Sequence, residues 1–242
     1  MRKLLLILMT AAVLAGCATH TPGGKHLFIL SGQSNIARMD PDQRFRPLLE
    51  QHFGKDNILV VKDAAGGQAI SRWDKQWALP IRDPLNAPGE KSPGDLYERL
   101  TRKVLAATEN QHVASISLIW MQGESDAYLR YGDIYKESVL RVYSQLQEDL
   151  HYRPINWVIG RISDYDLKNR AYKDWTRIRS IQMEIADSNP RFTWVDTDDL
   201  NDNINEAARL PMNDLHYSDE GYQLLGERFA EAAIRLIEKN DK

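Results

Sequence analysis

Short apolar runs alternate with longer amphipathic segments along most of this chain. Five runs are almost continuously apolar: residues 26–30, 58–62, 113–120, 154–162 and 192–195. Four segments between or after them repeat apolar residues at helical spacing: 95–109, 128–150, 173–186 and 218–239. Because parallel strands are covered by helices on both faces, this alternation predicts a parallel sheet of about five strands inside a three-layer α/β/α sandwich.

Small and polar motifs follow the ends of the first four predicted strands. These motifs are Ser34, Gly66-Gly67, Gln122 to Asp126, and Arg161 to Asp164. The carboxyl ends of parallel strands lie at one edge of a sheet, where α/β proteins bind their ligands. We therefore expect a single site at this edge. The proline-rich segment 77–94 is expected to be neither helix nor strand and to form a wall of that site.

The first 25 residues differ in character from the rest. Arg2 and Lys3 precede an uncharged run that ends in small residues and Cys17. This pattern predicts a signal peptide over 1–16, with a cleavage site that resembles that of bacterial lipoproteins. An acylated Cys17 would hold the protein on a membrane, facing the periplasm or the cell surface; the alternative is an ordinary thiol. Residues 17–25 would then be a flexible tether, and 26–242 a single domain.

Composition agrees with one exported domain. With 242 residues, 43% of them hydrophobic, the chain can bury one substantial core. A single cysteine excludes an internal disulfide. The net charge of −3, which becomes more negative when Arg2 and Lys3 are removed, argues against a nucleic-acid partner. We expect no metal or other cofactor, since the acidic residues between 196 and 202 lack the spacing of a known calcium loop.

Two residues could form a nucleophile and its base. Ser34 follows the first predicted strand, although a serine there could equally cap a helix. A serine hydroxyl becomes a nucleophile when a base removes its proton and donors stabilise the oxyanion that follows. His216 stands in a loop just before the last predicted helix, from which its imidazole could reach a hydroxyl. The alternative is a structural histidine at the start of that helix.

Three blocks together resemble the SGNH (GDSL-like) hydrolase superfamily, and within it the sialate O-acetylesterase and carbohydrate esterase family six branch. The blocks are Gly32-Gln33-Ser34-Asn35, Gln122-Gly123-Glu124 and Asn213-Asp214-Leu215-His216. The resemblance implies a flavodoxin-like sheet and an esterase that removes O-acetyl groups from carbohydrate. It also implies Ser34 as the nucleophile and His216 as the base. The Ser34 amide, Gly67 and Gln122 would form the oxyanion hole.

The acid that orients the imidazole stays open at this point. Many SGNH enzymes place an aspartate three positions before the histidine, where this chain has Asn213. Asp214 is one residue closer to the histidine. The carbohydrate esterase branch can use the glutamate of its Gln-Gly-Glu block, which is Glu124 here. A dyad without a strong acid is a third possibility.

Two questions remain for the sequence: which residues contact the substrate, and which other functions the same motifs allow. Four residues near strand ends are candidate substrate contacts: Arg72, Trp73, Arg161 and Tyr165. Aromatic faces pack on sugar rings, although most tryptophans in a domain of this size lie in the core. A lipase-like or thioester-cleaving hydrolase, or a glycan-binding lipoprotein without catalysis, fits the same motifs, and the fold alone does not distinguish them.

Overall fold

The computed structural model describes residues 23–78, 92–201 and 215–240. At its centre is a five-stranded parallel sheet in the order β2-β1-β3-β4-β5. The strands are β1 (Lys25–Gly32), β2 (Ile58–Ala64), β3 (Val113–Met121), β4 (Asn156–Gly160) and β5 (Phe192–Val195). This strand order is flavodoxin-like, so the predicted sheet and its topology are confirmed.

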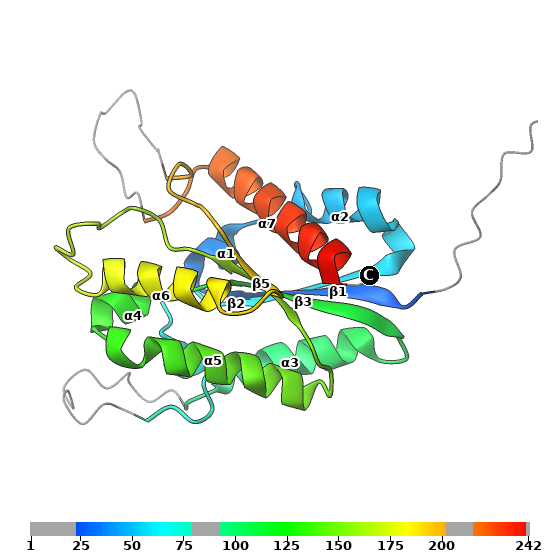
Figure 1. Cartoon of the computed structure of the whole chain (residues 1–242), viewed down its shortest axis with the longest axis horizontal. Coiled ribbons are helices and arrows are strands. Elements are labelled where there is room, and N and C mark those ends of the chain that lie inside the picture. Colours follow the sequence, from blue (N-terminus) through cyan, green and yellow to red (C-terminus); the bar gives the residue numbers. More distant parts are fainter. Residues whose placement is uncertain (1–22, 79–91, 202–214, 241–242) are drawn as a thin grey trace, which may run out of the picture.

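Helices cover both faces of the sheet, as Figure 1 shows. One layer contains α1 (Ser34–Arg38), α2 (Phe45–Phe53) and α7 (Asp219–Asn240). The opposite layer contains α3 (Asp95–Thr108), α4 (Glu124–Leu129), α5 (Gly132–Asp149) and α6 (Trp175–Asp187). Two short 3-10 turns are η1 (Lys55–Asn57) and η2 (Ile70–Arg72). None of the described helices is both long enough and apolar enough to cross a membrane.

Two hydrophobic cores, one on each side of the sheet, hold these layers together. Phe28, Leu30 and Phe229 belong to the core under α2 and α7, while Ile29 and Trp175 belong to the core under α3, α5 and α6. Successive residues of β1 therefore point into opposite cores, because side chains alternate along a strand. This two-sided burial explains why the strand reads as a continuous apolar run rather than an alternating one.

Two helical details differ from the predicted pattern. The single helix expected over 128–150 is divided into α4 and α5, because Arg130 adopts a left-handed conformation with φ of 62° and ends α4. Helix α2 was not predicted. Its sequence places Pro47 close to its start, where the ring is tolerated because the first N–H groups of a helix have no partner within it.

The ends of β1 and β3 are held close together, and this closeness positions the site. Gly32 ends β1 with φ of 138°, and a Cβ atom there would lie 2.0 Å from the Met121 carbonyl oxygen. Only glycine fits such an approach. The next amide, Gln33 N–H, donates to the same Met121 oxygen at 2.9 Å. Ser34 and Glu124, which follow the two strands, therefore start from neighbouring points of one sheet edge.

Candidate active site

A cavity of about 530 Å³ opens at the carboxyl edge of the sheet. Its walls come from the segments after β1, β2 and β3, from the loop before α6 and from the loop before α7. Among the lining residues are Ser34, Gly67, Glu124, Tyr128, Tyr172 and His216. The position agrees with the general rule for such sheets, because the strand order changes direction between β1 and β3.

Ser34 and His216 meet in the wall of this cavity. The Ser34 Oγ and His216 Nε2 atoms lie 3.0 Å apart, although the residues are separated by 182 positions in the chain. Burial, followed by the positive charge of Arg38, lowers the pKa of the His216 imidazole. Both effects favour the neutral ring, whose nitrogen can accept the hydroxyl proton. This pair can therefore convert a serine hydroxyl into a nucleophile.

Asn35 connects the two halves of the site from within the core. Its Nδ2 atom donates to Glu124 Oε1 at 2.9 Å and to the Leu215 carbonyl at 3.2 Å. Its Oδ1 atom accepts from the Tyr222 hydroxyl at 3.0 Å. Because Leu215 directly precedes His216, these bonds hold the histidine loop against the segment that carries the serine. Asn35 belongs to the first of the three sequence blocks, but its role depends on contacts with distant segments that the sequence does not indicate.

Glu124 supports this arrangement through its hydrogen bond with Asn35. Its Oε1 atom accepts from Asn35, and its Oε2 atom has no hydrogen-bond partner among the described residues. Burial raises the pKa of this carboxyl to about 7. Glu124 is therefore linked to the histidine loop through Asn35. The rival acid, Asp214, lies outside the described residues, as does Asn213.

Gln33 holds the start of α4 in place. Its Oε1 atom accepts hydrogen bonds from the backbone N–H groups of Gly123 at 3.4 Å and Ser125 at 3.3 Å. The Gln122 side chain donates to the same oxygen at 3.4 Å. A single buried amide beside Ser34 thus orders the backbone around Glu124 and joins the first two sequence blocks.

Gln122 is placed differently from the oxyanion donor that the resemblance implied. Its side chain is buried, and its Nε2 atom donates to the Gln68 carbonyl at 3.1 Å and to Asp126. Asp126 in turn accepts from the Ile70 N–H at 3.0 Å, and burial raises the pKa of its carboxyl to about 7. Gln122 and Asp126 therefore hold the loop after β2, and Gln122 does not line the cavity.

Gly66 and Gly67, in contrast, lie where the prediction placed them. Both line the cavity. A Cβ atom on Gly66 would lie 3.6 Å from the Ser34 Cβ atom, so the loop passes directly beside the serine. Gly67 has φ of 66°, a conformation that favours glycine. The loop of Gly66 and Gly67 and the segment of Ser34 thus meet in the wall of the cavity.

The sequence itself matches a family model described as a carbohydrate esterase, sialic acid-specific acetylesterase, over residues 36–235. The chain belongs to this carbohydrate esterase family. It is therefore a carboxylic ester hydrolase, and the predicted sialate O-acetylesterase and carbohydrate esterase branch is confirmed. No curated protein matches the sequence at a significant level.

Several solved structures share the fold of this esterase. NanS has a TM-score of 0.64 at 14% identity, over 91% of this chain and 99% of its own. A protein from Arabidopsis thaliana has a TM-score of 0.65 at 18% identity, over 88% and 98%. XAC1771, described as a novel carbohydrate acetylesterase from Xanthomonas citri, has a TM-score of 0.62 at 14% identity, over 88% of this chain and 57% of its own.

Two predicted substrate contacts of the esterase are wrong. Trp73 is only 1% exposed, because its ring packs edge-on against Trp120 at 5.4 Å and its Nε1 atom donates to Ser31 Oγ. Arg72 is buried as well, and its guanidinium binds Asp95. Both residues follow the loop of Gly67, but that loop turns inward after the cavity. Both side chains hold the loop from the protein interior and do not line the cavity.

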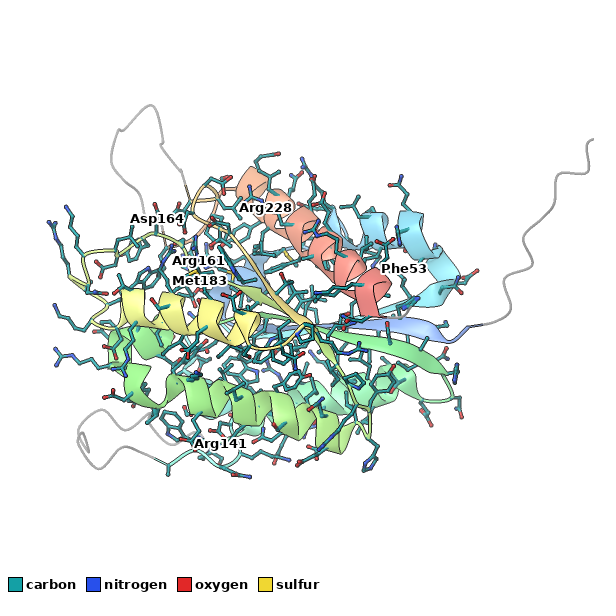
Figure 2. All side chains as sticks on the ribbon, in the orientation of Figure 1. Phe53, Arg141, Arg161, Asp164, Met183 and Arg228 are labelled. Atoms are coloured by element: carbon teal, nitrogen blue, oxygen red, sulfur yellow. The ribbon has the colours of Figure 1, made fainter. Side chains whose placement is uncertain are left out.

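The third predicted substrate contact, Arg161, does not line the cavity. Figure 2 shows it beside Met183, and its Nη1 atom lies 3.4 Å from the methionine sulfur. Its guanidinium binds Asp196 and Asp198 and stacks over Trp194 at 4.5 Å, away from the cavity. These carboxylates are thus neutralised by arginine. Among the residues that the structure describes, no three metal-ligating side chains are gathered in one place.

Tyr165, the fourth predicted substrate contact, lies beside a residue of the cavity wall. It does not line the cavity itself, but its ring lies 5.6 Å from that of Tyr172, which does. Tyr128, on α4, also lines the cavity, and its ring lies 5.5 Å from that of Tyr172. Neither Tyr128 nor Tyr172 was predicted to contact the substrate. Each follows a strand-end motif in the sequence, but a tyrosine in such a position occurs often by chance.

Proposed function

We propose that this esterase removes O-acetyl groups from carbohydrate, with Ser34 as the nucleophile and His216 as the general base. The distance of 3.0 Å between the Ser34 hydroxyl and the His216 imidazole, in the wall of a cavity, is the observation that carries the proposal. Membership of a carbohydrate esterase family supports it. XAC1771, described as a carbohydrate acetylesterase, shares the fold.

The geometry suggests a two-step reaction. Ser34 Oγ attacks the acetyl carbonyl carbon while His216 Nε2 takes the hydroxyl proton. The bond between the acetyl carbon and the sugar oxygen then breaks, and the imidazole returns the proton to that oxygen. Water, deprotonated by His216, next attacks the acetyl-Ser34 ester. The bond between the acetyl carbon and Ser34 Oγ breaks, the imidazole returns the proton to Oγ, and acetate leaves. Backbone N–H groups of Ser34 and Gly67 would stabilise the oxyanion in both steps.

Replacement of the nucleophile tests this proposal. Ser34→Ala should abolish hydrolysis of 4-nitrophenyl acetate and covalent labelling by a fluorophosphonate, while far-UV circular dichroism stays unchanged. Ser180→Ala, which removes an exposed serine hydroxyl on α6, should retain both activities. Turnover that persists in pure, folded Ser34→Ala protein would defeat the assignment. Wild-type protein that binds glycans but resists labelling would favour a binding protein instead.

The acyl group can be tested separately from the mechanism. An acetyl-specific site should hydrolyse 4-nitrophenyl acetate much faster than the octanoate, because the cavity must then exclude a long acyl chain. Equal or faster cleavage of the octanoate, with Ser34 still required, would indicate the lipase-like alternative on the same scaffold.

We propose further that the protein is exported and held on a membrane by an acylated Cys17. The support is the sequence of residues 1–17, which lies outside the described residues. Metabolic labelling with a fatty-acid analogue should mark the wild-type protein in the membrane fraction. Cys17→Ala should lose the label and either remain unprocessed or leave the membrane. An unlabelled wild-type protein would remove the anchor from this proposal.

A further inference from the structure

A row of three tyrosines leads away from the cavity along the surface. We call Tyr128, Tyr172 and Tyr165 the tyrosine row. Tyr172 is its central member, with ring centroids 5.5 Å from Tyr128 and 5.6 Å from Tyr165. Tyr128 is 62% exposed and Tyr165 is 37% exposed, which places both among the few large apolar side chains open to solvent in the described part of the chain.

The row is continuous with the proposed acetyl site. Tyr128 and Tyr172 line the same cavity as Ser34 and His216. Tyr165 does not line the cavity, but its ring contacts that of Tyr172. A molecule whose reacting ester lies at Ser34 would therefore reach the tyrosine row with its adjoining part.

The backbone that presents two of these rings is held rigidly. Asp166, which is buried, accepts backbone N–H bonds from Arg170 at 2.8 Å, Ala171 at 2.8 Å and Tyr172 at 2.7 Å. The Trp175 indole lies fully buried against both Tyr165 and Tyr172, at 5.4 Å and 5.1 Å. Its Nε1 atom donates to the Ser163 carbonyl at 2.7 Å. The exposed rings are thus preorganised, which lowers the entropy cost of binding.

We propose that the tyrosine row is a subsite for the sugar unit next to the acetylated one. The inference rests on the proposed function and adds to it that the preferred substrate is an acetylated unit within a glycan, rather than a free acetylated monosaccharide. A sugar ring offers C–H groups that pack on an aromatic face, while its hydroxyls remain in water. Exposed aromatic rings beside the cavity fit this ligand, because adjoining exposed apolar side chains offer a surface on which the C–H face of a sugar can pack.

Matched substrates of different length test the subsite. The probes are acetylated xylose against acetylated xylotetraose, and O-acetylated sialic acid against O-acetylated sialyllactose. Wild-type protein should show the higher kcat/KM on the longer member of at least one pair. Tyr165→Ala should lower kcat/KM on that longer member by roughly 3- to 10-fold, the range expected for loss of one aromatic contact. The ratio of long to short substrate should fall with it.

Two further variants separate a sugar contact from a structural effect. Tyr165→Phe keeps the aromatic face and should restore the ratio of the wild type. Leu105→Ala truncates a side chain of 53% exposure near the end of α3, at the opposite edge of the sheet, and should leave the ratio unchanged. Circular dichroism and the melting temperature establish that each variant is folded.

The possible results are distinguishable. Failure of the wild type to hydrolyse even 4-nitrophenyl acetate would refute the proposed function. Hydrolysis of that ester without any preference for the longer glycans would overturn the subsite alone. The same conclusion follows if the preference exists but survives in Tyr165→Ala.

Discussion

Replacement of Glu124 by glutamine tests how the buried carboxyl affects stability. Burial raises the pKa of this carboxyl from 4.5 to about 7. The folded protein therefore holds the proton more tightly than the unfolded chain does. Stability from this group is fully present below pH 4.5, falls as the pH rises and is lost above pH 7. Glutamine cannot ionise, and its Oε1 atom can still accept the hydrogen bond from Asn35.

The size of the effect follows from the two pKa values. The interval between 4.5 and about 7 corresponds to roughly 3 kcal/mol of unfolding free energy, because one pKa unit is about 1.4 kcal/mol. Raising the pH from 5 to 8 should therefore lower the unfolding free energy of the wild type more than that of Glu124→Gln. The difference between the two proteins should be most of these roughly 3 kcal/mol. Asp126 contributes to the loss in both proteins. Charge repulsion from Glu124 raises the pKa of Asp126. Because Glu124→Gln removes this repulsion, it also reduces the loss of stability that comes from Asp126, which adds to the expected difference.

Urea unfolding followed by tryptophan fluorescence measures this difference. The free energy of unfolding is determined at pH 5 and pH 8 for the wild type, for Glu124→Gln and for Glu109→Gln, whose glutamate is exposed. The exposed substitution should follow the wild type at both pH values. If Glu124→Gln also follows the wild type, the folded protein does not hold an extra proton at Glu124 and the reasoning fails.

Two other predictions concern activity. Arg38→Gln should move the acid limb of the kcat/KM profile to higher pH, because the arginine charge lowers the pKa of His216; an unmoved limb in pH–rate measurements would contradict this. Asn35→Ala should lower kcat roughly 100-fold by releasing the loop before His216. Tyr222→Phe, which removes one hydrogen bond of Asn35, should cost only about 1 kcal/mol of stability. Equal kcat values for the two variants would show that Asn35 does not position the histidine.

The sequence predicted the architecture because strands and helices each give a characteristic spacing of apolar residues. Continuous apolar runs such as that of β1 occur when both faces of a strand are buried, and this property is local to the run. The resemblance then supplied Ser34 and His216, and the structure brings their side chains to 3.0 Å. A helix interrupted by one left-handed residue, as at Arg130, leaves a much weaker trace, because its apolar spacing continues across the break.

The direction in which each polar side chain points was decided only by the tertiary structure. Gln122 and Trp73 stand close to the cavity in sequence, yet both face inward, because the partners that hold them are Asp126 and Trp120. The sequence by itself therefore determined the parallel sheet and the edge at which the site lies. The contacts of Asn35 and the tyrosine row required the folded chain, since they join segments whose separation along the sequence carries no information about their distance in space.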